Sequence, residues 1–446
     1  MQVTDLAQAA PSVWGMDPKI VATAIVVVCY AILFTEKLNR AVVALLGAAL
    51  MIFSGILTQE TALQGIDFNT ISLLVGMMTI VGISEKSGMF QFVAVWGAKK
   101  VRANPRGLLI VLAFVTAVFS AFLDNVTTVL LIAPVTFQIT RKLKINPYPY
   151  LVLEIFASNL GGTATLIGDP PNILIGSSLD LSFMDFLVTL TPVVVAAMLI
   201  LLLVFDFIWG RHLVTTAQSK NLVMKMNEFD CITDKLLLFK SLGVLFLVIA
   251  CFILAHPLGL DNGTIALSGA ALLLLLYSSR FKGSEREDKV QEIFNSVDWT
   301  TIFFFIGLFV MVYGLEVTGV LEILGQYFLE LTDGSLEKMM FLILWSSAIF
   351  SSVIDNIPFV ATMIPMLKSI EESMGGREAM MPVWWALSLG ACFGGNGTLI
   401  GASANVVVAG MAMREGHPIG FLKFLLWSVP VMLMSVIVAT VFLYFE

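Results

Sequence analysis

The sequence is short of charge, of cysteine motifs and of nucleotide-binding motifs. Only 13 % of its 446 residues are charged and 58 % are hydrophobic, which excludes an ordinary soluble domain. No G-x-x-x-x-G-K-[ST] motif occurs, so the chain is not expected to hydrolyse ATP through a P-loop. The four cysteines have no CxxC or metal-ligand spacing, so neither a disulfide framework nor a zinc site is predicted and they are expected to be packing residues: Cys29, Cys231, Cys251 and Cys392. The sequence therefore predicts a polytopic membrane protein, with no cofactor and no tightly bound metal ion.

Two further absences concern processing and partners. Residues 1–19 have no basic segment ahead of an apolar core, so no cleaved signal peptide is expected and the mature chain is expected to start near Met1. The formal net charge is −7 and no nucleic-acid-binding module is recognisable, so nucleic acid is not an expected partner. The lipid bilayer is the expected surroundings.

Apolar windows of about 17 to 25 residues mark the candidate membrane crossings. The sequence predicts crossings at 20–35, 41–57, 67–85, 150–176, 185–208, 236–255, 262–279, 298–316, 380–412 and 421–445. Two further apolar regions are interrupted at the centre by Asp-Asn and are predicted to be re-entrant hairpins, 107–143 and 338–372. With both termini on the outer side of the plasma membrane of a prokaryote, this arrangement leaves only four basic residues outside, Lys19, Lys338, Lys368 and Arg377. The positive-inside rule therefore favours it.

The two halves of the chain are related in sequence, which indicates an internal repeat. DFNTISLLVGMMTIVGISEKSG (67–88) aligns without gaps on DWTTIFFFIGLFVMVYGLEVTG (298–319), and the same offset brings Asp124-Asn125 onto Asp355-Asn356. After two inserted residues, GGTATLIGDPPN falls on GGNGTLIGASAN, at 161–172 and 394–405. Each half, 1–232 and 233–446, would hold five crossings and one hairpin, and an odd number of crossings inverts the second copy. No soluble domain is predicted.

Both copies of the third motif interrupt a predicted crossing. Pro170 and Pro171 remove two amide donors, and the freed backbone groups are tolerated at membrane depth only where they line a cavity enclosed by protein. Broken helices that meet near the midplane are typical of secondary transporters built from inverted repeats. The sequence therefore predicts unwound helices in 150–176 and 380–412. An ordinary proline kink filled by neighbouring helices is the alternative.

At Asp124-Asn125, Asp355-Asn356 and the two unwound motifs, the sequence resembles the ion transporter superfamily. It looks most like the arsenite/antimonite permeases of the ArsB type and the related NhaD-type sodium/proton antiporters. The resemblance implies an all-α fold in which hairpins and unwound helices form a transport domain that moves against a scaffold in an elevator-like cycle. It also allows a homodimer and a separate arsenic-pump ATPase subunit as partners. Carboxylate-transporting members carry a Ser-Asn-Thr type motif at the hairpin tips, where this chain has Asp-Asn, which argues against a carboxylate substrate.

Polar residues at the hairpin tips and in the unwound motifs are the candidate substrate ligands. They are Asp124, Asn125, Thr127, Thr163, Thr165, Asn172, Asp355, Asn356, Asn396, Thr398, Ser403 and Asn405. No lysine or arginine is expected among them, so a neutral or cationic substrate fits better than an anion. Each hydroxyl has the alternative of bonding to its own helix backbone, and the two hairpin aspartates have the alternative of capping a helix. The symmetric Glu85 and Glu316 are expected to belong to the scaffold.

The predicted function is export of arsenite, and of antimonite, from the cytoplasm in exchange for protons. Arsenous acid is mostly neutral and its three hydroxyl groups match an Asn/Thr/Asp cradle. A sodium/proton antiporter of the same superfamily is the alternative, followed by a carboxylate or anion transporter and by a channel. Asp169 aligns with Ala402, so it has no partner under the repeat and is the predicted proton-coupling residue, with Asp124 and Asp355 as alternatives. Capping of a half-helix that starts near Pro170 is the competing role for Asp169.

Overall fold

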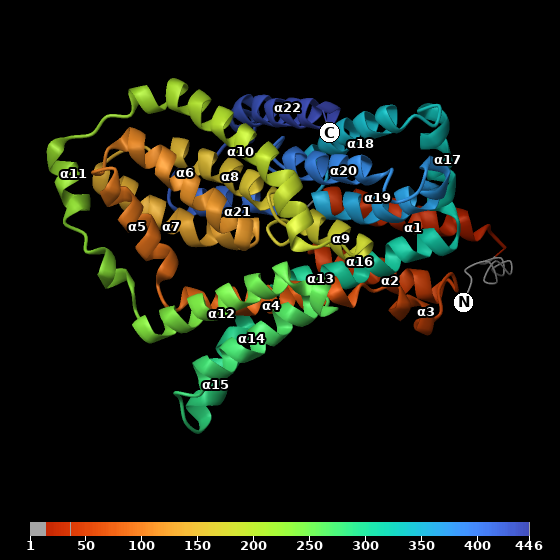
Figure 1. Cartoon of the computed structure of the whole chain (residues 1–446), viewed down its shortest axis with the longest axis horizontal. Helices are drawn as coiled ribbons and strands as arrows, with labels where there is room; N and C mark the ends of the chain where they lie inside the picture. Colours follow the sequence, from red (N-terminus) through yellow and green to blue (C-terminus); the bar gives the residue numbers. More distant parts are fainter. Residues whose placement is uncertain (1–14, 36, 446) are drawn as a thin grey trace.

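The computed structural model describes residues 15–35 and 37–445, which form helices joined by turns (Figure 1). These described ranges contain no β-strand, so the prediction of an all-α protein is confirmed. The predicted start of the mature chain near Met1 lies outside them.

The first half of the chain contains α1 Pro18–Phe34, α2 Arg40–Phe53, α3 Gln59–Gln64, α4 Phe68–Glu85, α5 Met89–Lys100, α6 Pro105–Phe122, α7 Asn125–Leu143, α8 Tyr148–Thr163, α9 Pro170–Leu179, α10 Phe183–Ile208 and α11 Ala217–Met224. The second half contains α12 Lys235–Ile253, α13 Ala255–Leu258, α14 Asn262–Ser278, α15 Ser284–Ser296, α16 Trp299–Val317, α17 Val320–Leu331, α18 Leu336–Val353, α19 Asn356–Ile370, α20 Met381–Gly394, α21 Ser403–Arg414 and α22 Phe421–Phe445. Short 3₁₀ helices occupy Gly210–His212, Glu228–Cys231 and Glu372–Met374.

Seven of the described helices are long and apolar enough to cross a bilayer, which agrees with a polytopic membrane protein. They are α4, α6, α10, α12, α16, α18 and α22, and four shorter helices, α1, α2, α14 and α20, are apolar too. The first arms of the two predicted hairpins, α6 and α18, have 18 residues each and are among the seven. Length therefore does not separate a crossing arm from a re-entrant one, and the count of ten crossings and two hairpins stays a prediction.

Several helices lie where the sequence predicts only connections. α5 follows α4 and α17 follows α16, and each begins after a glycine in the left-handed region, Gly88 at φ 79° and Gly319 at φ 74°. A residue with a side chain would be strained at this φ, which explains why glycine stands at both positions. As helices, both segments pair most of their backbone N–H and C=O groups internally.

Helices that correspond under the repeat pack in corresponding ways. α2 packs on α16 and α4 packs on α14, while α6 packs on α8 and α18 packs on α20. Glycine permits the second kind of contact, because a Cβ atom at Gly161 would overlap the backbone of Ala117 and one at Gly394 would overlap the backbone of Ala348. The two halves therefore use the same pair of positions for this close helix contact.

Replacing Gly161 by alanine is expected to lower the free energy of unfolding by about 1–3 kcal/mol, because the added methyl group overpacks a helix contact that has no room for it. Gly410 is the matched control, since it lies inside α21 and its Cβ would meet nothing within 4 Å. Gly410→Ala should be neutral or stabilising by up to about 1 kcal/mol. Thermal unfolding of the purified variants in one detergent tests this, and equal melting temperatures would contradict the expected overlap.

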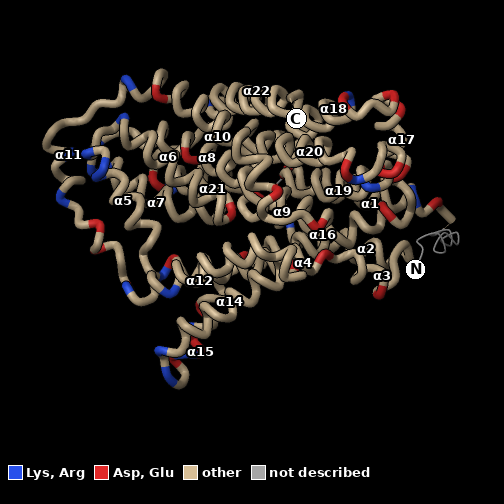
Figure 2. The backbone as a smooth tube through the Cα atoms, in the orientation of Figure 1, with Lys and Arg blue, Asp and Glu red and all other residues tan. Residues whose placement is uncertain are grey.

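Lysine and arginine gather at one end of the molecule, around α5, α11 and the ends of α12 and α15, whereas the end near α3 and α17 carries both signs (Figure 2). The two ends of the molecule along its long axis therefore differ in their content of lysine and arginine. This distribution agrees with the pattern from which the orientation is predicted. Which face is cytoplasmic stays a prediction.

Candidate functional site

Four helices begin at one cavity of about 480 Å³ near the centre of the fold. α7 and α19 begin at the two predicted hairpin tips, and α9 and α21 begin within the last three residues of the motifs 161–172 and 394–405. The cavity is lined from these four starts by Asp124, Asn125, Val126, Thr127, Asp169, Pro170, Asn356, Ile357, Ala402 and Ser403. Because the first N–H groups of a helix carry a partial positive charge, four such ends make the cavity attractive to anions.

The opposite wall of the cavity comes from α2, α4 and α16. α4 contributes an apolar surface that ends in Glu85, and α16 contributes Thr301 next to its N-cap residue Asp298. Glu85 therefore faces the cavity from the helix that the sequence assigns to the scaffold.

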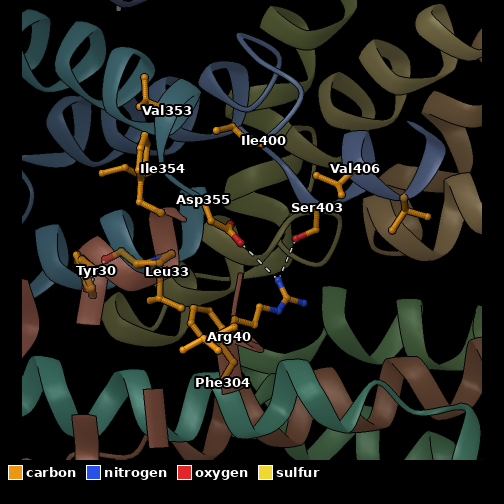
Figure 3. A pocket seen from close by; sticks show the side chains of 14 residues that line it. Tyr30, Leu33, Arg40, Phe304, Val353, Ile354, Asp355, Ile400, Ser403 and Val406 are labelled. Carbon is orange, nitrogen blue, oxygen red and sulfur yellow. Dashed lines mark hydrogen bonds and ion pairs between the residues drawn. The ribbon is translucent and has the colours of Figure 1, made fainter. Parts of the chain in front are cut away.

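Arg40, the first residue of α2, points into this region from the same wall (Figure 3). Its Nη1 atom donates to Ser403 Oγ at 2.9 Å and to Asp355 Oδ2 at 3.4 Å. Its Nη2 atom donates to Thr301 Oγ1 at 2.6 Å and lies 3.6 Å from Asp298 Oδ2. The expectation that no lysine or arginine lies in the site is therefore wrong. Arg40 belongs to a connection in the sequence, and only the fold brings it to the hairpin tip.

A second cavity of about 290 Å³ adjoins the first and shares Arg40 and Ser403 with it. Asp355 lines this second cavity, together with apolar residues of α1, α16 and α21 (Figure 3). The guanidinium of Arg40 therefore lies at the boundary between the two cavities.

The three candidate aspartates have different surroundings. Asp124 caps α7, because its carboxylate accepts from the backbone N–H of Thr127 at 2.9 Å and from the hydroxyl of the same residue. Asp355 caps α19 through Ile357 N at 3.4 Å and also accepts from Arg40. Capping, which the sequence left as the alternative for both residues, is therefore present at both hairpin tips.

Asp169 is the aspartate without a cap or a cation. Its side chain is 1 % exposed and makes no capping hydrogen bond to α9. Oδ1 accepts from Asn356 Nδ2 at 3.3 Å, and Oδ2 has no hydrogen-bond partner among the described residues. An unpaired carboxylate oxygen that is buried at the wall of a cavity is a natural position for a proton.

An asparagine network lies behind the cavity. Asn159 Nδ2 donates to Asn396 Oδ1 and to Asn405 Oδ1, each at 3.0 Å, and Asn159 Oδ1 accepts from Asn125 Nδ2 at 3.3 Å. Asn159 thus joins the first hairpin tip to the second unwound motif. The alignment gives no signal for it, because Asn159 lies on Cys392 when 161–172 is placed on 394–405.

Two further asparagines hold the helix breaks together. Asn172 donates to the carbonyl groups of Thr163 and Thr165 at 3.0 and 2.9 Å, and its own oxygen accepts from Ser388 Oγ at 2.6 Å. Asn405 donates to Gly395 O and Thr398 O at 2.8 and 2.9 Å. The freed carbonyl groups are therefore satisfied from the other side of each break, as buried backbone at membrane depth requires.

The cavity thus receives six of the predicted ligand and coupling residues, Asp124, Asn125, Thr127, Asp169, Asn356 and Ser403. The remaining hydroxyls bond to backbone carbonyls: Thr163 to Asn159, Thr165 to Ala121 and Thr398 to Ser352. Thr163, Thr165, Asn172, Asn396, Thr398 and Asn405 do not line it. Their described contacts support the breaks, and the role of all the candidates as substrate ligands stays a prediction. The described residues include no group of three or more His, Cys, Asp or Glu arranged to hold a metal ion.

Comparison with known proteins identifies the family. The sequence profile of the citrate transporter family (CitMHS) matches residues 30–390, which is most of the chain. The chain belongs to the citrate transporter family. It is therefore a secondary transporter and not an enzyme, and the site described above is the central cavity of a citrate-family transporter.

Related proteins occur in bacteria and in mammals. An uncharacterised transporter of Mycobacterium tuberculosis is 43 % identical over 430 residues, which cover 95 % of this chain and 98 % of that protein. The P protein of Homo sapiens is 33 % identical over 504 aligned positions, covering 95 % of this chain and 59 % of the human protein. The alignment with the bacterial relative thus covers almost the whole length of both proteins.

Solved structures support the fold. The YdaH transporter of Alcanivorax borkumensis superposes with a TM-score of 0.62 over 96 % of this chain and 98 % of that one, at 13 % identity. MtrF of Neisseria gonorrhoeae superposes with a TM-score of 0.55 over 89 % and 83 %, also at 13 % identity. At such identities the likeness concerns the fold alone. The comparisons thus support a citrate-family transporter, and the narrower resemblance to ArsB-type permeases stays a prediction.

Proposed function

We propose that this transporter carries a small carboxylate anion, with citrate as the first probe, in a cycle coupled to protons. The observation that carries the proposal is the convergence of four helix N-termini and the guanidinium of Arg40 on one cavity of about 480 Å³. Oriented N–H groups and a fork of guanidinium donors are the groups that recognise carboxylates in proteins. The family description agrees with this substrate class.

Protons balance the charge of the loaded cavity. Four carboxyl groups line it and Asp355 adjoins it, so an anion that entered alone would face these five groups opposed by the guanidinium of Arg40: Glu85, Asp124, Asp169 and Asp298 are the four. Protonation of a carboxylate removes one of these repulsions. Asp169 is the proposed proton carrier, because its Oδ2 atom has no hydrogen-bond partner among the described residues whereas Asp124 and Asp355 are engaged as caps.

Arsenite export is the second candidate. Uncharged polar side chains favour it, since Asn125, Thr127, Asn356 and Ser403 line the same cavity and offer donors and acceptors to a neutral hydroxylated molecule. Arg40 weakens this candidate, because a neutral solute gains less than an anion from a neighbouring guanidinium. Antimonite would be a second substrate if arsenite is exported. The separate arsenic-pump ATPase subunit is proposed as a partner only under this candidate function.

We also propose that the two halves form an inverted repeat with an elevator-like cycle, with both termini outside the plasma membrane. Equivalent scaffold residues lie at two separate cavities: Glu85 and Asp298 at the central one, Glu316 and Asp67 at another of about 220 Å³. The moving transport domain could therefore pack against equivalent scaffold residues at either of these two positions. A homodimer remains a prediction from the resemblance.

Transport by purified protein in liposomes tests the proposal. An inward proton gradient should drive labelled citrate above its equilibrium level, and a protonophore should abolish the accumulation. Arsenite accumulation without citrate transport would select the second candidate and refute the first. Proton flux that answers sodium alone would select the sodium/proton antiporter and refute both.

A further inference from the structure

A second buried carboxylate lies away from the cavity, in the interior of α8. Glu154 is 1 % exposed and accepts at Oε1 from the hydroxyl of Thr136 on α7 at 2.5 Å. Its Oε2 atom has no hydrogen-bond partner, and no ion pair involves Glu154 among the described residues. Because an isolated ionised carboxylate is costly in apolar surroundings, this burial favours the protonated form of Glu154.

The helices packed against α8 bring no counter-charge to Glu154. These helices are α6, α7, α10, α20, α21 and α22. The ionisable side chains of these helices lie near the helix ends, and the thiol of Cys392 on α20 contacts Asn172. The others are Arg106 on α6, Arg141 and Lys142 on α7, Asp185 and Asp206 on α10, Arg414 on α21, and Lys423 and Tyr444 on α22. The charge of Glu154 is therefore set by its proton and not by a partner.

The fold does not require a carboxylate at this place. The offset that pairs Gly161 with Gly394 also pairs Pro149 with Pro382, and it places Glu154 on Leu387. The offset of the hairpin arms likewise places Thr136 on Leu367. Leu367 and Leu387 are fully buried, so the second half has leucines at the two equivalent buried positions. The polar pair Thr136 and Glu154 has no counterpart in the second half. This difference indicates a role other than packing.

A small cavity at the surface lies one helical turn from the hydroxyl group that contacts Glu154. Thr140 lies one turn beyond Thr136 on α7 and donates to its carbonyl oxygen at 2.7 Å. Thr140 also lines this cavity of about 60 Å³, together with exposed Arg141, Glu415 and His417. The cavity is large enough for water, which makes it a source of protons close to Glu154.

We propose that Glu154 is a second proton-binding site, filled from this surface cavity and separate from the substrate cavity. A proton from water at the surface binds Oε2 and converts the carboxylate to the neutral acid, and release returns the charge to Glu154. Five residues of α8, a rise of about 7.5 Å, separate Glu154 from Asn159 of the asparagine network. A change of charge at Glu154 thus acts next to the groups that hold the hairpin tip. The inference rests on the proton coupling of the proposed function.

Infrared difference spectra of the full-length protein in lipid, recorded between mildly acidic and mildly alkaline buffer, test the site without a substrate. Asp169→Asn is the background for this test, because it removes the other buried carboxyl group that is proposed to exchange a proton. A carboxylic acid carbonyl band that changes with pH is expected in Asp169→Asn, and it should be absent when Glu154→Gln is added. Thr136→Leu/Glu154→Leu in the same background copies the second half, so it should fold and lack the band. A band that Asp169→Asn/Glu154→Gln retains, or one that does not respond to pH, would overturn the proposal.

Proton and citrate fluxes measured on the same liposomes test the role in transport. Glu154→Gln keeps the hydrogen bond from Thr136, so a purely structural role predicts wild-type transport with the same number of protons per citrate. The proposal predicts fewer protons per citrate or a shifted pH profile, and unchanged values of both would refute it. If the wild type carries no citrate, the proposed function fails, whereas the infrared band still decides whether Glu154 exchanges its proton.

Discussion

Arg40→Gln is expected to weaken citrate transport by on the order of 30-fold or more in KM, because loss of one partner of a close charge pair costs about 2 kcal/mol or more. The glutamine retains donors for Ser403 and Thr301 but no longer offers a positive charge to an anion. Arg40→Lys keeps the charge without the planar fork, so it should recover only part of the loss. Initial rates of labelled citrate uptake over a range of concentrations measure the effect.

Arg106→Gln is the matched control for Arg40. Arg106 is also the arginine of an ion pair, with both its Nε and Nη2 atoms donating to Asp206, but it does not line the central cavity. Its substitution should leave the KM for citrate unchanged. A large fall in the maximal rate of Arg40→Gln at constant KM would instead assign Arg40 to holding α2 against Asp355, and not to the substrate. An unchanged rate with arsenite would support the neutral substrate.

Asp169→Asn is expected to abolish proton-driven accumulation while substrate binding is retained. The amide oxygen of asparagine can still accept from Asn356, and the amide NH₂ replaces the oxygen that has no partner, so the shape of the site is kept. Only the exchangeable proton is lost. Citrate should then equilibrate across the liposome membrane without exceeding its equilibrium level, whatever the pH gradient.

Asp180→Asn is the control for this variant, since Asp180 is exposed at the other end of α9. The substitution removes the same charge at a position away from the cavity. It should accumulate citrate like the wild type. If Asp169→Asn still accumulates citrate with an unchanged pH dependence, the proton carrier is another group. Asp124 and Asp355 are then the next candidates, as the sequence already indicates.

The local elements of the site could be predicted because their signals lie within a few residues. An aspartate followed by the first turn of a helix predicts a cap, and both Asp124 and Asp355 are N-cap residues. Pro170-Pro171 and the equivalent motif at 394–405 predict helix breaks, and α8 and α20 end there. These features depend on backbone chemistry near one residue, so the sequence is sufficient for them.

The surface helices could not be placed in this way. α5 and α17 have only 12 residues each, and a hydropathy window long enough to find a crossing averages them into the adjoining connections. Their glycine starts are a usable signal in retrospect, since Gly88 and Gly319 align under the repeat.

By itself the sequence determined the membrane class and the helix breaks, and it offered capping as an alternative role for Asp124 and Asp355, because each follows from local backbone chemistry or from a linear pattern of residues. Only the tertiary structure decided which side chains face the cavity. Arg40 meets Asp355 across 315 positions of the chain, and Thr165 and Thr398 turn from the cavity to carbonyl groups on other helices. The direction of a side chain and the partner it finds depend on which helices pack together, and that packing brings together residues far apart in the chain.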